Sequence, residues 1–244
     1  MNIDEGRTGK RPVGTILLVL ANVLVFANFI TFSGYESILT EWGFTPAFIV
    51  QGARLETLVT HMFFHVDVPH IYFNMCFLAG FGYSVEKKIG TPRFLFVYLL
   101  SGVFAALFYT LLNMGSTVVC VGASGAIFAL MSAYAVVYSK KKSRALFLSR
   151  RVRVPAFMIV LVMIFAEFVY LMLGLTPSVA NAVHIGGAIG GVVVLGMLFP
   201  ARTLDGVLEI VLSVVEPIVK VIGGILAVLS GSGKSEGEDR ESAD

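Results

Sequence analysis

The stretch Val121-Gly122-Ala123-Ser124-Gly125-Ala126-Ile127-Phe128-Ala129 opens a long apolar segment with a serine set between glycines. A hydroxyl group near hydrocarbon needs a partner, because an unpaired buried polar group costs on the order of a few kcal/mol. The candidate partner is His184, which lies in a second apolar segment, in Val183-His184-Ile185-Gly186-Gly187. The first expectation from the sequence is that these two side chains meet.

The composition places both segments in a membrane protein. The chain has 244 residues, of which 57% are hydrophobic and 14% are charged, and its mean hydropathy is +0.85. Soluble domains carry about 25% charged residues. Cys76 and Cys120 form neither a disulfide framework nor a metal-binding pattern, and we expect no metal and no cofactor.

Hydropathy predicts an all-α polytopic bundle, since a spanning helix needs about 20 mostly apolar residues. Six segments meet or nearly meet this length, and the second is short, with polar residues in its first turns. The predicted spans are Val13–Phe32, His70–Val85, Phe94–Asn113, Cys120–Ser139, Val154–Gly174 and Asn181–Phe199.

The connections between these segments predict the orientation, because Lys and Arg stay on the cytoplasmic side. The extracytoplasmic connections contain one basic residue, Arg54. Fourteen others lie in the N-terminus, in the second and fourth connections and just after the sixth span: Arg7, Lys10, Arg11, Lys87, Lys88, Arg93, Lys140, Lys141, Lys142, Arg144, Arg150, Arg151, Arg153 and Arg202. We therefore expect a multi-pass protein of the cell membrane with both termini in the cytoplasm.

These patterns divide the chain into four predicted parts. Residues 1–12 form a cytoplasmic N-terminus, and residues 13–200 form the six-span bundle, whose long first connection (33–69) is apolar enough to dip into the membrane interface. Residues 204–230 carry Asp205, Glu209, Glu216 and Lys220 on one helical face, which favours an amphipathic helix on the cytoplasmic surface, with a seventh span as the alternative. Residues 231–244 are rich in Gly, Ser and charge, and are predicted to be disordered.

Three polar residues lie at similar depth in the predicted bundle. Asn74, Ser124 and His184 each follow the start of an even-numbered span by about four residues, which is roughly 6 Å at 1.5 Å per residue. Those three spans all enter from the extracytoplasmic side. His70 shares the face of Asn74, because the two residues are four apart.

Small residues give these helices a way to approach one another. Gly187 and Gly191 continue the face of His184, while Gly125, Ala129 and Ala133 form a second stripe that starts beside Ser124. Faces of this kind allow close contact between membrane helices.

Nucleophilic catalysis is the chemistry that fits this set. A serine hydroxyl becomes a useful nucleophile when a neighbouring base takes its proton, and His184 is the candidate base and later acid. The Asn74 amide, the His70 imidazole and the Ser124 backbone N–H are candidate donors to an oxyanion. The sequence places no acid as an obvious third member, so a Ser–His dyad is expected.

Each residue also has a simpler explanation when taken alone. Ser124 is typical of a packing serine beside glycines, His184 of a donor to a backbone carbonyl, and Asn74 of a tie between helices. His61, His65 and His70 are spaced like a metal cluster but lack a completing Cys or acid. Shared depth and spacing favour the catalytic interpretation.

The motifs His70-x-x-x-Asn74, Gly122-x-Ser124-Gly125 and His184-x-x-Gly187-x-x-x-Gly191 together resemble the rhomboid intramembrane serine proteases. The resemblance covers about residues 13–200. It implies a nucleophilic Ser124, a basic His184, and His70 and Asn74 around the oxyanion. It also implies that Phe128 packs against the catalytic histidine, with Gly122, Gly125, Gly187 and Gly191 supporting the site.

Further residues match or depart from that family. His61, His65 and Glu86 resemble upstream histidines and a glutamate-containing connection. The family's Trp-Arg pair in the first connection has no counterpart, since Glu56-Thr57 stands there, and Val183 replaces a small residue. Neither departure removes a group that the chemistry requires.

The expected function is that of an intramembrane serine endopeptidase, which cuts transmembrane protein substrates in or near the membrane. Its partners would be those substrates and the lipid bilayer, with no nucleic acid. A non-enzymatic rhomboid-like protein that binds membrane clients is the alternative, although such proteins typically lack the serine or the histidine. A transporter that uses Glu167 in a proton relay would predict inverted repeats, which the sequence lacks.

Overall fold

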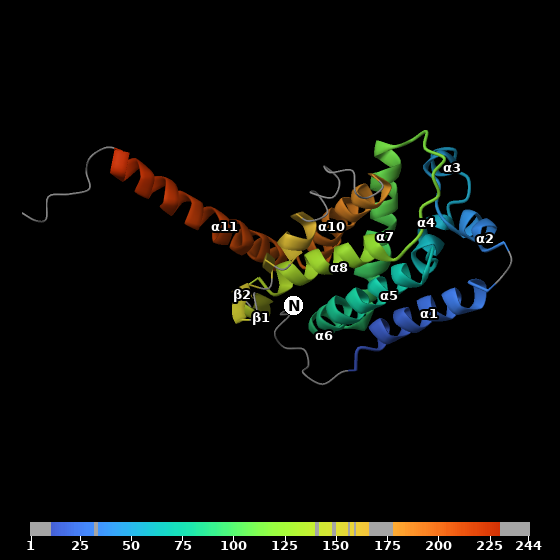
Figure 1. Ribbon diagram of the computed structural model, residues 1–244, viewed down its shortest axis with the longest axis horizontal. Coiled ribbons are helices and arrows are strands. Elements are labelled where there is room, and N and C mark those ends of the chain that lie inside the picture. The colour runs from blue at the N-terminus through green and yellow to red at the C-terminus, as the bar shows by residue number, and fades with distance from the viewer. Residues whose placement is uncertain are drawn as a thin grey trace, which may run out of the picture.

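The computed structural model is a bundle of helices with one short hairpin (Figure 1). It describes residues 11–31, 34–139, 142–147, 150–155, 157–158, 160–165 and 178–229. Its elements are α1 (Val13–Phe29), α2 (Tyr35–Trp42), α3 (Pro46–Val50), α4 (Thr57–Thr60), the 3₁₀ turn η2 (His61–Phe63), α5 (Val68–Phe77), the π-helical turn η3 (Leu78–Gly82), α6 (Tyr83–Ile89), α7 (Thr91–Leu112), α8 (Ser124–Val137), β1 (Lys142–Phe147), β2 (Arg150–Pro155), α10 (Ser178–Leu198) and α11 (Pro200–Leu229).

The predicted spans compare with these helices as follows. Among the described residues, α7 and the stretch Asn181–Leu198 of α10 are long and apolar enough to cross a membrane, while α1 and α8 are apolar but shorter. The second predicted span is continuous through α5, η3 and α6. The fifth is described only in part, and Glu167 lies outside the described residues. The helical class is confirmed, while the count of six spans stays a prediction.

The hairpin corrects one predicted boundary. Val154 was expected to open the fifth span, whereas the structure pairs Val154 with Ser143 in the two antiparallel strands. Arg151, Val152, Arg153 and Val154 alternate between basic and β-branched side chains, and this period of two favours a strand over a helix.

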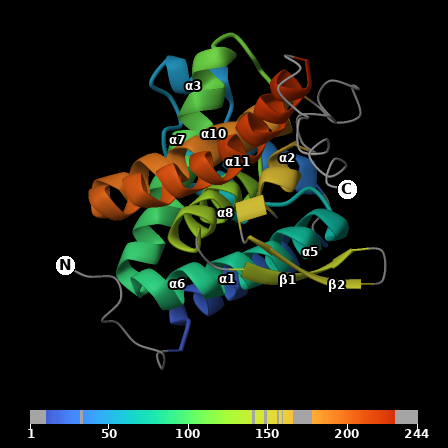
Figure 2. The ribbon, with the colours of Figure 1, turned by 90° about the vertical axis from the view of Figure 1, so that its left-hand side faces the viewer.

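Helix α8 is the centre of the bundle. Eleven of its fourteen residues are buried, and it packs against α7 and α10 on one side and against η3 and α6 on the other. Most of its residues are small or aliphatic, so neighbouring helices can approach from several directions. The view in Figure 2 shows α8 between α10 and the layer formed by α5 and α6.

The first connection forms a cap over one end of the bundle. Phe44 and Cys120 exchange two backbone hydrogen bonds of 3.0 and 2.8 Å, and Ala47 N–H donates to Ser116 O at 3.0 Å. Phe44 and Ile49 are buried, while Trp42 stacks on the ring of Phe64. Phe44 therefore helps to hold this cap to the chain segment before α8, while Trp42 and Phe48 are 38% and 39% exposed, and the dip of this connection into the membrane interface stays a prediction.

At the opposite end, Glu86 joins three helices. Its buried carboxylate accepts hydrogen bonds from Gly14 N–H (2.8 Å), Thr15 N–H (2.7 Å), Thr15 Oγ1 (2.7 Å) and Thr91 Oγ1 (2.6 Å). The first turn of α1 has N–H groups without partners in its own helix, and a carboxylate there also suits the helix dipole. Glu86 thus ties the starts of α1 and α7 to α6.

Glu86→Gln is expected to lower the free energy of unfolding by about 3 kcal/mol, because the amide NH₂ group would face donors and leave at least one buried hydroxyl or N–H unpaired. The exposed Glu41 provides the control, since Glu41→Gln should change stability by about 0.5 kcal/mol or less. Denaturant titrations in one detergent would compare the two variants. Equal stabilities would show that the Glu86 carboxylate does not hold the helices together.

Candidate active site

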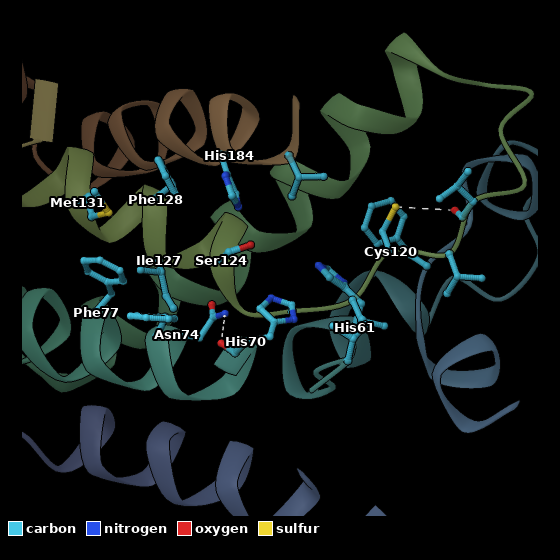
Figure 3. Close-up of a pocket in the computed structure, with 18 of the residues that line it drawn as sticks. His61, His70, Asn74, Phe77, Cys120, Ser124, Ile127, Phe128, Met131 and His184 are labelled. Atoms are coloured by element: carbon cyan, nitrogen blue, oxygen red, sulfur yellow. Dashed lines mark hydrogen bonds between the residues drawn. The ribbon is translucent and has the colours of Figure 1, made fainter. Parts of the chain in front are cut away.

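The four predicted catalytic residues line one cavity of about 680 Å³. Ser124 opens α8, His70 and Asn74 lie on α5, and His184 lies on α10. Figure 3 shows the Ser124 side chain between His184 on one side and His70 on the other. The rest of the lining is mainly apolar, so the cavity presents a few polar groups in a low-dielectric setting.

Gly122 controls the approach of His70 to the segment that carries Ser124. Gly122 has φ +120, and a Cβ atom there would lie 2.8 Å from His70 Cε1 and 2.9 Å from His70 Nε2. Both the dihedral angle and the lack of space therefore require glycine. Gly122 N–H also donates to His61 O at 2.9 Å, which fixes the backbone just before the serine.

The start of α5 is held by a cap that orients His70 and Asn74. The Asp67 side chain accepts a hydrogen bond from His70 N–H at 2.7 Å, as an N-cap residue does. Asn74 Nδ2 donates to His70 O at 2.8 Å. Because a primary amide has two N–H bonds, Asn74 keeps one donor for another acceptor.

His184 stacks on Phe128 from the neighbouring helix. The two ring centroids are 4.3 Å apart and the planes differ by 7°. Ser124 and Phe128 are four residues apart on α8, so they share a face of that helix. The face that presents the serine hydroxyl to the cavity therefore also fixes the plane of the imidazole.

The glycine stripe of α10 allows it to lie directly against α8. A Cβ atom at Gly187 would collide with the backbone of Gly125, and one at Gly191 would collide with Ala129 O and Ser132 Oγ. A Cβ atom at Gly125 would lie 2.9 Å from Val183 Cγ1. The predicted close approach of the two helices is thus confirmed along both stripes.

His61 and His65, two of the four histidines in the chain, lie in the cap beside the site. His61 lines the cavity, and its Nδ1 hydrogen-bonds to Thr57 O at 2.9 Å. Burial lowers its pKa to about 4, against the weaker opposing effect of that hydrogen bond. His65 is fully buried with its ring edge-to-face against His70, and burial, with His70 adding to it, lowers its pKa to about 3. Both imidazoles are therefore neutral at neutral pH.

The structure adds apolar residues that the motifs did not include. They continue the helical faces of the polar residues: Phe77 follows Asn74 by three residues, and Ile127 and Met131 follow Ser124 by three and seven. The extended segment Val118–Val121 and Met163 complete the wall. Phe77, Ile127 and Met131 could have been predicted from their helical spacing from Asn74 and Ser124.

The helical bundle thus holds one cavity lined by a serine, three histidines and an asparagine. The family model described as the Rhomboid domain matches residues 52–201, and the chain belongs to the rhomboid family, whose members are embedded in membranes.

Several curated proteins are similar to the chain. Rhomboid protease GluP of Bacillus subtilis is 28% identical over 213 residues, which cover 84% of this chain and 40% of GluP. Rhomboid protease GlpG of Yersinia pestis is 29% identical over 188 residues, covering 76% of this chain and 62% of GlpG. RHOMBOID-like protein 6, mitochondrial, of Arabidopsis thaliana is 30% identical over 59% of this chain and 43% of its own length. The chain thus spans less than two thirds of each of these relatives.

Proposed function

We propose that the chain is an intramembrane serine endopeptidase that cleaves membrane-protein substrates in or near a transmembrane segment. The observation that carries this proposal is that Ser124, His184, His70 and Asn74 line the same cavity, although they come from three helices far apart in the sequence. Two relatives are named as rhomboid proteases, and Figure 3 shows the side chains of Ser124 and His184 at the same cavity.

In the first half of the proposed reaction, Ser124 Oγ attacks the carbonyl carbon of the scissile peptide bond while His184 accepts the hydroxyl proton. The carbonyl oxygen becomes an oxyanion. His70 and the free N–H of the Asn74 amide are the donors proposed for it, since both side chains lie on the same wall of the cavity. When the C–N bond breaks, His184 returns the proton to the leaving amine, and an acyl ester on Ser124 remains.

In the second half, water must reach the ester. His184 takes a proton from that water as it attacks the acyl carbon, and then protonates Ser124 Oγ as the ester bond breaks and the acid product leaves. The stacking of His184 on Phe128 keeps the imidazole in one plane for both transfers. The reaction requires no cofactor.

The geometry also supports the proposed orientation in the membrane. Arg202 Nη2 donates to Val137 O at 3.1 Å, and the Arg93 guanidinium lies 5.3 Å from the centroid of the Phe199 ring. These basic residues therefore gather at the end of α8 opposite to Ser124. With that end in the cytoplasm, both termini are cytoplasmic and the site opens toward the other side.

Labelling with a fluorescent fluorophosphonate tests the proposal. Purified protein in detergent at neutral pH is expected to become covalently labelled, and mass spectrometry of the digested protein should find the adduct on the peptide that contains Ser124. Ser132, on the same helix with its hydroxyl bound to Ala129 O at 2.9 Å, should carry none. Absence of any adduct on folded protein would contradict an activated serine and would favour the client-binding alternative.

A further inference from the structure

Helix α11 has an apolar surface that no other part of the described chain covers. It is the longest helix of that part, with 30 residues, and every described side chain from Val211 to Leu226 is exposed. The exposed side chains include Val211, Val215, Ile218, Val219, Ile222 and Leu226. A bare apolar surface of this length is typical of an interaction site.

The charged residues of α11 form a narrow stripe. At 100° per residue, Asp205, Glu209, Glu216 and Lys220 project within about 60° of one another, while large apolar residues occupy about 200° of the circumference. Lys220 Nζ lies 2.6 Å from Glu216 Oε1, and both side chains are exposed. The helix is therefore strongly amphipathic, with the apolar part dominant.

The start of α11 is fixed at one end of the bundle. Only Phe199 separates it from α10. A Cβ atom at Gly206 would lie 2.5 Å from Val136 O, so the two backbones touch there, and Arg202 binds Val137 O. Figure 1 shows α11 continuing beyond this end of the bundle rather than turning back along α8 and α10.

We infer that α11 lies in the interface of the bilayer, with its apolar face among the acyl chains and its charged stripe toward the water. Lipid is the occupant that fits best, because the adjoining part of the bundle also exposes apolar residues: Val193 and Met197, near the end of α10. An apolar arc of about 200° is also much wider than the seam that one partner helix covers.

A transmembrane course for α11 conflicts with the same observations. It would place Glu216 and Lys220 inside the hydrocarbon, where ionised side chains normally face the interior of a bundle. Here neither faces the interior of a bundle, since 65% and 73% of their side-chain surfaces are exposed. The interface accommodates this pair at the level of the lipid headgroups.

The net charge of α11 predicts whether anionic lipids strengthen the binding of this helix to the bilayer. On α11 the carboxylates of Asp205, Glu209 and Glu216 and the cationic groups of Arg202 and Lys220 sum to −1, so anionic lipids offer this helix no net attraction. Burial of the apolar face alone holds the helix, and its depth should be the same in zwitterionic and in partly anionic vesicles.

Quenching of tryptophan by brominated lipids tests this inference on the full chain in phosphatidylcholine vesicles. Ile218→Trp places the probe on the apolar face and Ser213→Trp beside the polar stripe, and both positions are exposed, so neither change removes packing. The wild-type chain, with Trp42 alone, gives the background. We expect Ile218→Trp to be quenched at least about twofold more by bromine near the headgroups than by bromine deep in the acyl chains, with little quenching of Ser213→Trp.

Two results would overturn the inference. Strongest quenching of Ile218→Trp by deep bromine would make α11 a transmembrane segment. No quenching of Ile218→Trp by either lipid would mean that water or protein covers the apolar face. The measurement does not depend on proteolysis, so its outcome is separate from that of the proposed activity.

Discussion

Ser124→Ala is expected to abolish cleavage of a membrane-protein substrate, lowering the rate by about 10⁴-fold or more. The proposed reaction passes through an ester on Ser124 Oγ, and Ser124 is the only serine or threonine among the described residues that line the cavity. Loss of the nucleophile removes the covalent route, while the oxyanion donors retain only a small residual effect. The measurement is the initial rate of cleavage of a single-span substrate reconstituted with the protease in proteoliposomes.

The matched control is Ser132→Ala, two turns further along the same helix. Its hydroxyl binds its own helix at Ala129 O and is not part of the cavity lining, so the rate should stay within about threefold of the wild type. A Ser124→Ala variant that is folded and cleaves within tenfold of the wild type would rule out the covalent route.

Combining Ser124→Ala with His184→Gln tests whether the two residues act as one unit. When a base serves only to activate a nucleophile, removing both costs about as much as removing either one. The double variant should therefore be no slower than Ser124→Ala alone. A further loss of more than about tenfold would assign His184 a separate role, such as direct binding of the substrate.

The sequence was most informative where a polar residue lay inside an apolar segment. Hydrocarbon tolerates few such groups, so each polar residue in a span indicated a possible functional position. Three of them at equal depth predicted a common site. Ser124, His184 and Asn74 do line one cavity. The glycines of α10 were equally informative, because small residues at helical spacing have few other uses between membrane helices.

Contacts between irregular segments could not be predicted in this way. The backbone pairing of Phe44 with Cys120 joins two connections that have no periodicity, and backbone hydrogen bonds do not depend on side-chain type. The same holds for Gly122 N–H and His61 O. Such contacts hold the cap beside the cavity. The residues of the site could therefore be predicted from their positions along the helices, whereas the contacts of the cap could not.

The predicted start of the fifth span was wrong because a hydropathic pattern and an alternating strand pattern overlap there. Val152 and Val154 raise the hydropathy around the predicted start of the fifth span, although they alternate with Arg151 and Arg153 and pair in β2. A hydropathy window averages over this alternation, whereas the period of two retains it. The apolar wall of the cavity was missed for a related reason, since Phe77 and Met131 look like ordinary core residues until the polar residues beside them are taken as a site.

Gly187→Ala is expected to destabilise the protein by about 3 kcal/mol and to reduce cleavage together with stability. A Cβ atom at this position collides with the backbone of Gly125, the residue next to Ser124. Overpacking against a flexible side chain costs about 1–3 kcal/mol, but a backbone cannot rotate away, so α10 and α8 must separate. Separation moves His184, one turn before Gly187, away from the start of α8. Denaturant titration in detergent would measure the stability, and the proteoliposome assay the rate.

Gly196→Ala is the matched control, because it lies on the same helix and its Cβ atom would meet only Thr203 Cγ2 at 3.7 Å, an ordinary contact. Removing a helical glycine without a collision should stabilise the protein by up to about 1 kcal/mol, mainly by restricting the unfolded chain. The two substitutions are chemically identical and are expected to act with opposite signs. If Gly187→Ala were as stable and as active as Gly196→Ala, close contact between α8 and α10 would not be what positions the serine and the histidine.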